Sequence, residues 1–217
     1  MKIATWNVER PRTAGKKNAS IEAAIASVNA DILILTETNE CINPGVGYNV
    51  LHSATLTESF YTRGERRVSI FSKYPFGEQI ATFNAETSVC VKIQTSLGEL
   101  AVYGTIIGTQ GNREKSFQTD LELQILDLNK IAEEHQLCIA GDLNISFSDN
   151  YYYTIAGRVE LNAAFDFLGL VNTTTHIPEN IDHIVLPKSF LEKKTNTEVW
   201  NHDKKLSDHI GVAVTLY

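Results

Sequence analysis

Residues 137–144 read LCIAGDLN, and this stretch carries the pattern that decides the fold. An apolar run of strand length passes directly into glycine, aspartate and asparagine. Polar residues also adjoin apolar runs at residues 6–9 (WNVE), 36–39 (TETN), 181–183 (IDH) and 207–209 (SDH). Polar residues at one strand end are common in turns, but five such ends favour a cluster of functional groups at one edge of a β structure.

Eight short apolar runs, many rich in Val and Ile, predict strands. They cover residues 2–6, 32–36, 68–71, 89–94, 100–107, 137–140, 181–186 and 210–216. Helices are predicted at residues 20–28, 113–135 and 159–168. In the longest, apolar residues recur every three or four positions, which is typical of a helix that packs on a sheet, and its acidic face is expected to be solvated. No G-x-G-x-x-G follows the first strand, so we predict an α/β sandwich rather than a doubly wound sheet.

Length and charge narrow the class of protein. The chain has 217 residues, is 43% hydrophobic and 21% charged, and contains no segment of linker composition, so we expect one globular domain over residues 1–217. A domain of this size buries roughly 70% of its unfolded surface without disulfides or structural zinc. The net charge of −7 argues against a protein held on nucleic acid by bulk positive charge. It is compatible with an enzyme that acts on phosphates, because metal-binding carboxylates contribute to the excess.

The cysteines and the apolar runs suggest a compartment. Cys41, Cys90 and Cys138 show no C-x-x-C spacing, and we expect them to be free thiols. The N-terminal residues do not resemble a signal peptide, and no run approaches the roughly 18 apolar residues of a membrane span. We therefore expect a cytoplasmic protein with no membrane span and no evident obligate protein partner.

The polar strand ends, taken together, resemble the endonuclease/exonuclease/phosphatase superfamily, which includes pancreatic deoxyribonuclease, apurinic endonucleases, sphingomyelinases and inositol polyphosphate phosphatases. The matching stretches are residues 4–9 (ATWNVE), 31–37 (DILILTE), 68–75 (VSIFSKYP), 141–144 (GDLN), 181–184 (IDHI) and 206–209 (LSDH), in the order of the family. The resemblance implies a four-layer α/β/β/α sandwich of two mostly antiparallel sheets flanked by helices. It also implies a metal-dependent phosphoesterase, a nuclease-like hydrolase.

The resemblance assigns a metal site. A phosphodiester resists water because its own negative charge repels the nucleophile, and a bound Mg²⁺ offsets that charge and lowers the pKa of water. Magnesium prefers hard oxygen ligands and keeps several waters, so one or two carboxylates suffice. The family pattern gives the ligand role to Glu37, with Asp208 as a second carboxylate, and Mn²⁺ is a plausible substitute for Mg²⁺. Glu9 is either an outer ligand, where apurinic endonucleases often carry Asp, or a solvated loop carboxylate.

The same resemblance distributes the catalytic roles. Asn7 would position the phosphate or a metal-bound water, and Asp142 would orient or deprotonate the attacking water. Asn144 would donate a hydrogen bond to a phosphate oxygen. His209 would supply a positive donor, with Asp182 holding its ring and keeping it protonated. The sequence leaves open whether Asp142 or His209 is the base.

The chain departs from the family pattern in the predicted strand at residues 100–107. Many members carry a second active-site histidine after this strand, and here there is none. Tyr103 occupies the region instead, as in the apurinic-endonuclease branch. It either contacts the scissile phosphate or leaving group, or is a buried core tyrosine.

Two basic loops adjoin the predicted site. We expect Arg10 in one, and Arg66 and Arg67 in the other, to bind substrate. Three consecutive tyrosines at residues 151–153 are suited to stacking on an unpaired base, worth roughly 1–3 kcal/mol each, although at least one is expected in the core.

The leading hypothesis is a Mg²⁺-dependent phosphodiester hydrolase, a nuclease on DNA or RNA that uses in-line attack of water. The alternatives are a phosphatase or phosphodiesterase on a small-molecule or lipid phosphate, and a catalytically silent binding module. The sequence does not decide the substrate, endo- against exo-cleavage, the number of metal ions or the oligomeric state.

Overall fold

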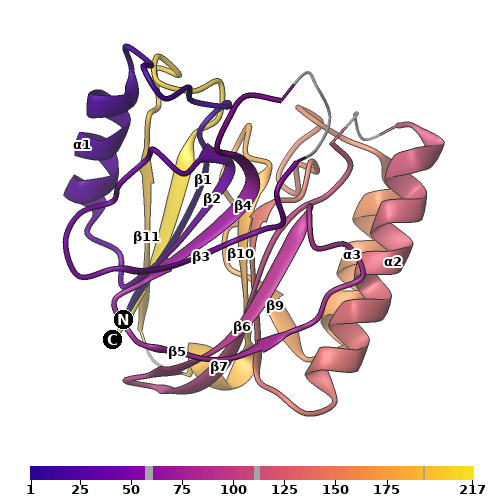
Figure 1. Ribbon diagram of the computed structural model, residues 1–217. Coiled ribbons are helices and arrows are strands. Elements are labelled where there is room, and N and C mark those ends of the chain that lie inside the picture. The colour runs from indigo at the N-terminus through magenta and orange to yellow at the C-terminus, as the bar shows by residue number, and fades with distance from the viewer. Residues whose placement is uncertain (57–60, 110–112, 193) are drawn as a thin grey trace.

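The computed structural model describes residues 1–56, 61–109, 113–192 and 194–217, and shows two six-stranded sheets packed face to face (Figure 1). Helix α1 (Asn18–Val28) covers one outer face of this pair of sheets. Helices α2 (Lys115–Ala132) and α3 (Ile155–Phe167) cover the other. The predicted four-layer α/β/β/α sandwich is confirmed.

The first sheet joins the two ends of the chain. In spatial order it contains β11 (Thr195–Trp200), β12 (Gly211–Leu216), β1 (Lys2–Asn7), β2 (Ile32–Asn39), β4 (Glu65–Ser72) and β3 (Asn49–His52). Only β1 and β2 are parallel among these described strands, and α1 forms the crossover between them. The N-terminal amine donates to the Leu216 carbonyl over 2.7 Å, so both ends of the chain lie together (Figure 1).

The second sheet repeats this plan. In spatial order it contains β5 (Phe76–Ile80), β6 (Ser88–Thr95), β7 (Gly98–Ile106), β8 (Leu137–Asp142), β10 (Asp182–Pro187) and β9 (Leu170–Asn172). A short 3₁₀ helix, η1 (Lys188–Leu191), follows β10. Here β7 and β8 are the parallel pair, joined through α2, and the other pairs are antiparallel. Each sheet is therefore mostly antiparallel around one β-α-β unit.

Alternation along the strands divides the core into three layers. Inward-facing residues such as Ile34, Val91 and Val214 fill the space between the sheets. The opposite faces pack against the helices, with Ile21 and Ile25 of α1 buried on the first sheet. The corresponding residues of α2 are buried on the second sheet, and they include the predicted apolar positions Phe117, Leu121 and Leu128.

The predicted helices are present but their bounds differ. The prediction at residues 20–28 begins two residues late, because the first turn, from Asn18, presents mostly polar or small side chains. The prediction at residues 113–135 is longer than α2 at both ends. The prediction at residues 159–168 begins four residues late, because Ile155 and Val159 on α3 are 67% and 61% exposed and break the expected apolar pattern.

The sequence pattern missed four strands, and all four lie at sheet edges. They are β3, β5, β9 and β11. An edge strand pairs on one side and is covered incompletely, so it needs no continuous apolar run. β5 and β11, for example, contain no fully buried residue.

Gly141 in β8 shows how closely the parallel strands approach one another. Its φ is +144°, and a Cβ built on it would lie 1.8 Å from the carbonyl oxygen of Thr105 in β7. Gly98 has a similar φ of +130°, but its Cβ would make only an ordinary contact, 3.6 Å from Phe190. Gly98 is therefore a matched control for backbone strain without a clash.

We expect Gly98→Ala to lower the free energy of unfolding by about 1–3 kcal/mol through backbone strain. Gly141→Ala should cost at least about 2 kcal/mol more, because the Thr105 backbone must move. Urea unfolding of both variants and the wild type measures the difference. Equal losses would contradict the close approach of β7 and β8.

Candidate active site

The candidate site lies at the end of the sandwich where β1, β2 and β8 finish and β10 and β12 begin. Strand direction causes this convergence, because β10 and β12 run antiparallel to the strands that end there. Asp142, the last residue of β8, pairs in register with Asp182, the first residue of β10. The polar strand ends of the sequence thus meet at one edge of the two sheets.

The layer between the sheets changes from apolar to polar as it approaches this edge. On the inner face of β1, Asn7 follows Ile3 and Thr5, and all three side chains are buried. On β8, Asp142 follows Ala140 in the same way, and is 2% exposed. The site is therefore the polar end of the inner core rather than a separate surface feature.

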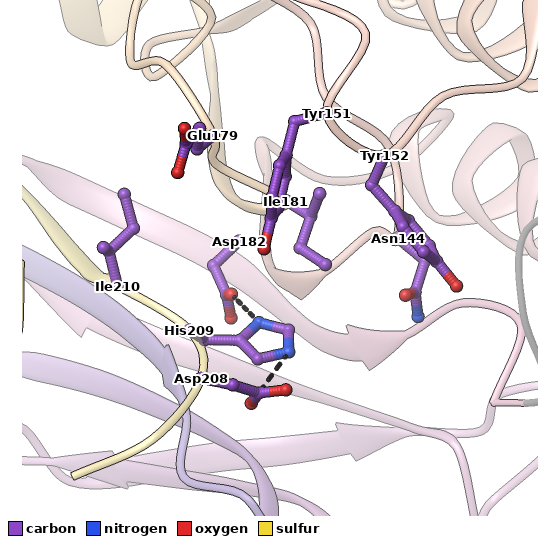
Figure 2. A pocket seen from close by; sticks show the side chains of 9 residues that line it. All are labelled: Asn144, Tyr151, Tyr152, Glu179, Ile181, Asp182, Asp208, His209 and Ile210. Carbon is purple, nitrogen blue, oxygen red and sulfur yellow. Dashed lines mark hydrogen bonds and ion pairs between the residues drawn. The ribbon is translucent and has the colours of Figure 1, made fainter. Parts of the chain in front are cut away.

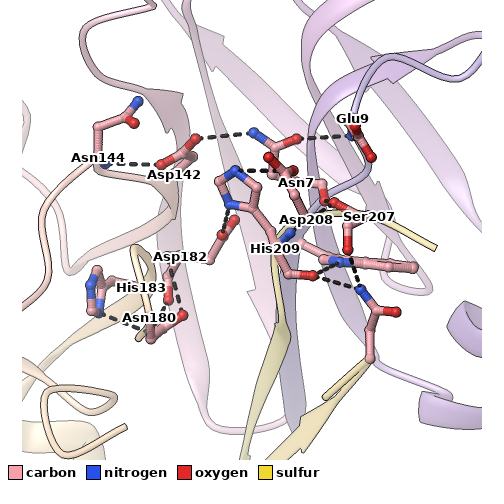
Figure 3. A network of polar contacts seen from close by, with 12 residues as sticks. Asn7, Glu9, Asp142, Asn144, Asn180, Asp182, His183, Ser207, Asp208 and His209 are labelled. Atoms are coloured by element: carbon pink, nitrogen blue, oxygen red, sulfur yellow. Dashed lines mark hydrogen bonds and ion pairs between the residues drawn. The ribbon is translucent and has the colours of Figure 1, made fainter. Parts of the chain in front are cut away.

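Asn7 and Asp142 connect the two sheets. The Asn7 amide nitrogen donates to Asp142 Oδ2 over 3.0 Å, and Asn7 Oδ1 accepts from the Glu9 backbone N–H over 2.9 Å (Figure 3). Asp142 Oδ1 accepts from the Asn144 backbone N–H over 2.9 Å. Asn144 has φ of 51°, so the chain turns there, and its amide donates to the Ile107 carbonyl over 2.8 Å. Both carboxylate oxygens of Asp142 are thus held in fixed directions.

Asp182 and His209 form a buried ion pair beside them. His209 Nδ1 lies 2.6 Å from Asp182 Oδ2, and His209 Nε2 lies 3.7 Å from Asp208 Oδ1 (Figure 2). Burial opposes a charge on His209, but Asp182, Asp142 and Asp208 outweigh it and raise the His209 pKa to about 10. The imidazole is therefore a cation at neutral pH, with its Nε2 side directed toward the exposed Asp208.

Asp142 has the opposite electrostatic balance. Burial raises its pKa to about 7, and the neighbouring Asp182 adds to this, whereas His209 acts against it. One ligand atom from each of Asp142, Asp182 and His209 lies within 4.8 Å of the others. A carboxyl group with a pKa near neutrality exchanges a proton readily at physiological pH.

Glu37 lies near the end of β2, at the same edge of the sandwich. Burial raises its pKa, and Arg67, His209 and Arg10 counteract that effect. Its side chain is 23% exposed, and the nearest cation is Arg67, whose Nη1 lies 3.9 Å from Glu37 Oε1. An ion pair this long leaves the carboxylate available to another cation.

Backbone strain is concentrated here. Eight non-glycine residues among those described have a positive φ, and four of them are Glu9, Arg10, Glu37 and Asn144. A left-handed conformation disfavours a glutamate or an arginine, and such residues persist only where the surroundings hold them. The fold therefore constrains the chain at the three strand ends that carry the site.

The loop that carries Asp208 and His209 is fixed by residues that the sequence analysis missed. Trp6 Nε1 donates to the His209 carbonyl over 3.1 Å, and the Asn201 amide donates to the same oxygen over 2.7 Å. Ser207 Oγ donates to the Asn7 carbonyl over 2.7 Å and accepts from the His209 N–H over 3.1 Å. Trp6 and Ser207 lie inside quoted motifs, but Asn201 lies eight residues before His209 and has no signal in the sequence.

Two predicted site residues have partners elsewhere in the fold. Tyr103 does not join the site, because it faces α2, is fully buried, and its hydroxyl donates to Asp127 Oδ2 over 3.2 Å. This is the core alternative. Arg66 lies on β4, but its guanidinium is bound to Glu40 and, over 2.8 Å, to the Ser53 carbonyl.

A cleft of about 200 Å³ opens beside His209 and Asp208 (Figure 2). Its walls include Asn144, Tyr151 and Tyr152. The expectation that at least one tyrosine of residues 151–153 packs into the core is wrong, since none of the three is buried and Tyr151 is 50% exposed. Lys204 Nζ lies over the Tyr151 ring, 4.5 Å from its centroid, and this contact supports the position of the ring at the cleft.

The ion pair predicts a titration. In metal-free protein, we expect Asp182→Asn to lower the His209 pKa by about 1–3 units, because the nearest counter-charge is removed while burial remains. The His209 ring signals in an NMR titration from pH 5 to 11 report this change, because the range includes the wild-type pKa of about 10. Asp203→Asn, an exposed carboxylate in the same loop, is the control and should leave the titration unchanged. An unchanged His209 pKa in Asp182→Asn would refute the assigned electrostatics.

Comparison with known proteins identifies the family. The model of the Endonuclease/Exonuclease/phosphatase family matches residues 4–209. A comparison with curated proteins gives no match.

Three solved structures share the fold over essentially the whole chain. A 3′ phosphatase, NExo from Neisseria, bound to a product DNA hairpin, has a TM-score of 0.77 at 16% identity and covers 100% of this chain and 99% of its own. An AP endonuclease from Archaeoglobus fulgidus has a TM-score of 0.76 at 14% identity, with 100% and 99% covered. The endonuclease domain of the retrotransposon TRAS1 has a TM-score of 0.69 at 18% identity, with 99% and 97% covered. The family model spans every strand end that forms the site, and the chain belongs to the endonuclease/exonuclease/phosphatase family of metal-dependent phosphoesterases.

Proposed function

We propose that this protein is a Mg²⁺-dependent phosphodiester hydrolase that cleaves DNA or RNA by in-line attack of water. The observation that carries the proposal is the pairing of Asp142, whose pKa is about 7, with a protonated His209 at one buried edge. One group accepts a proton at neutral pH and the other stabilises negative charge, which is what hydrolysis of a phosphodiester requires.

The donor set fits a hard divalent cation. Glu37 offers a half-buried carboxylate whose ion pair with Arg67 is long, at 3.9 Å, and Asp208 offers a 72% exposed one. Asp182 Oδ1 is buried and has no hydrogen-bond partner among the described residues. We propose that Glu37 and Asp208 hold Mg²⁺, or Mn²⁺ in its place, with Glu9 as an outer ligand. The ion would offset the charge of the phosphate and make water a better nucleophile.

The surrounding residues supply the proton transfer. Asp142 is the base, because the protonated His209 has no free site to accept a proton. Asn7 orients the Asp142 carboxylate through Oδ2, and the Asn144 N–H orients it through Oδ1. The attacking water gives its proton to Asp142 as its oxygen bonds to phosphorus. The bond from phosphorus to the leaving oxygen breaks on the opposite side, and the leaving oxygen takes a proton from solvent.

His209 acts on the phosphate. Asp182 binds Nδ1 and leaves the Nε2 proton for a phosphate oxygen on which negative charge develops. Asn144 lines the same cleft as His209, and its amide keeps a second proton, since the first is bound to the Ile107 carbonyl. Asn144 thereby stabilises the phosphate oxygens without adding repulsive charge.

Two features favour a nucleic-acid substrate. Arg10, Arg12, Lys16 and Lys17 line a hollow of about 260 Å³ that continues from Glu9. Tyr151 and Tyr152 line the cleft beside His209, where an aromatic ring can stack on a base. The NExo structure holds a DNA hairpin, which fits the same class of substrate. The net charge of −7 is the observation that favours a small-molecule or lipid phosphate instead.

We also propose that residues 1–217 act as one domain in the cytoplasm without an obligate protein partner. One apolar cluster includes residues of both sheets, and the three cysteines are free. No helix in the described ranges is long and apolar enough to cross a membrane.

Substitution of the proposed ligand and base tests the mechanism. Asp142→Asn should lower kcat on a labelled oligonucleotide by roughly 10²–10⁴-fold, because the base is lost. Glu37→Gln should raise the Mg²⁺ concentration needed for half-maximal cleavage by at least about tenfold, because a charged ligand is lost. Glu198→Gln, a carboxylate paired with Lys2 far from the site, is the control. Equal cleavage by the wild type and all three variants would contradict the mechanism.

A substrate panel decides between the two enzyme hypotheses. We expect Mg²⁺-dependent cleavage of single-stranded or looped oligonucleotides to exceed turnover of inositol phosphates, nucleotides and phospholipid head groups. Release of nucleotide products and of inorganic phosphate is measured for each compound. Turnover of a small phosphoester with none on oligonucleotides would establish the alternative.

A further inference from the structure

The three arginines predicted to bind substrate, Arg10 in the loop after β1 and Arg66 and Arg67 on β4, are held in different ways. Arg67 at the start of the buried part of β4 lies with its guanidinium carbon 4.9 Å from the centroid of the Tyr61 ring, and its Nη2 donates to the Tyr61 hydroxyl. Its Nη1 is 3.9 Å from Glu37 Oε1, too far for a hydrogen bond. Arg67 is thus fixed beside the proposed metal ligand without being neutralised by a close contact.

Arg10 reaches the same aromatic ring from the loop after β1. Its guanidinium carbon is 5.5 Å from the Tyr61 centroid, and its Nε donates to Glu65 Oε1 over 2.6 Å. Glu65 is buried, and its other oxygen accepts from Thr62. This anchored carboxylate fixes the Arg10 stem, while neither Nη atom has an acceptor in the part of the chain that the structure describes.

Arg66, the neighbour of Arg67, is arranged differently. Its Nε donates to Glu40 over 2.9 Å, its Nη2 also contacts Glu40, and its Nη1 donates to the Ser53 carbonyl over 2.8 Å. All three nitrogens are therefore occupied by the protein. The alternation of strand β4 also places Arg66 and Arg67 on opposite faces.

Arg67 lies 3.9 Å from Glu37, and Arg10 contacts the same Tyr61 ring as Arg67, whereas the guanidinium of Arg66 is bound to Glu40. An anion held beside Glu37 therefore has two fixed guanidinium groups close to it. A guanidinium with free Nη donors binds phosphate oxygens in a fixed geometry. One phosphate at the reaction centre uses His209 and Asn144, which leaves the arginine pair for another group.

We propose that Arg10 and Arg67, which both contact the Tyr61 ring, bind a second phosphate group of the substrate. This group lies next to the phosphate that is cleaved, and Arg66 does not bind it. This inference rests on the proposed hydrolase function and names its substrate class: a phosphoester that carries two phosphates. The second phosphate comes either from the next nucleotide of a strand or from a diphosphate.

Salt dependence of binding tests the subsite without requiring cleavage. A fluorescent single-stranded oligonucleotide is titrated by anisotropy in EDTA at several KCl concentrations, with the wild type, Arg10→Gln, Arg67→Gln and Arg66→Gln. Each phosphate contact contributes about 0.7 to the slope of log Kd against log salt for a single strand. We expect the slope to fall by about 0.7 in Arg10→Gln and in Arg67→Gln, and to stay unchanged in Arg66→Gln.

A second variant guards against a folding defect. Arg10→Lys keeps the charge, so its slope should match that of the wild type even if Glu65 is less well paired. Thermal unfolding of each variant shows that the fold is retained.

Competition against the labelled strand identifies the source of the second phosphate. A dinucleotide with a 5′ phosphate should compete better than the same dinucleotide without it if the subsite binds the next phosphate of a strand. A nucleoside diphosphate should compete better than the monophosphate if the two phosphates are directly linked. In both cases the advantage should disappear in the Arg10→Gln/Arg67→Gln double variant.

Unchanged slopes in Arg10→Gln and Arg67→Gln, an equal loss in Arg66→Gln, or no binding of any two-phosphate probe by the wild type would overturn the subsite. Binding with the expected pattern but no Mg²⁺-dependent cleavage would leave the subsite standing and remove the hydrolase function. Cleavage with unchanged slopes would do the reverse.

Discussion

The buried ion pair between Asp182 and His209 is the interaction on which the rest of the site depends. Asp142 and Asp182 face each other in register on adjacent strands, and both are almost completely buried. Two carboxylates in such a place repel each other and lose hydration, and a nearby cation is needed to keep either of them charged. His209, at 2.6 Å from Asp182, is that cation. Its own charge is stable only because the carboxylates surround it, so the three groups are interdependent.

That dependence explains the surrounding hydrogen bonds. His209 lies on a loop between β11 and β12, and a loop on its own does not hold an imidazole to within a fraction of an ångström. Trp6 and Asn201 donate to the backbone carbonyl of His209, and Ser207 accepts from its backbone N–H. Ser207 also donates to the Asn7 carbonyl, which connects this loop to the end of β1. The left-handed residues at the neighbouring strand ends have the same effect, since strain is tolerated where the fold fixes the backbone. Hydrogen bonds hold the backbone at the centre of the site, and Asp208 beside the cleft is its more exposed part.

Much of this architecture followed from pattern. Central strands bury both faces, so their Val- and Ile-rich runs are visible in the sequence, and all eight predicted runs became strands. Edge strands such as β5 and β11 bury little and left no comparable signal. Helix α3 was placed too late because its first turn exposes Ile155. Tyr103 shows what analogy to a family leaves open. Its neighbour Val102 faces the core between the sheets, so alternation along β7 directs Tyr103 to the opposite face, against α2.

The sequence by itself determined the family, the layered fold and the set of polar strand ends, because each of these depends on short local patterns. The patterns are apolar runs of strand length and the polar residues that follow them. Tertiary structure alone decided the pKa values, since burial and the distances between Asp142, Asp182 and His209 come from strands far apart in the chain. It also separated Arg67 from Arg66, which are neighbours in sequence. Consecutive strand residues point to opposite faces, so Arg67 contacts Tyr61 and Glu37 whereas Arg66 contacts Glu40. These partners come from other parts of the chain, and the whole fold brings them there.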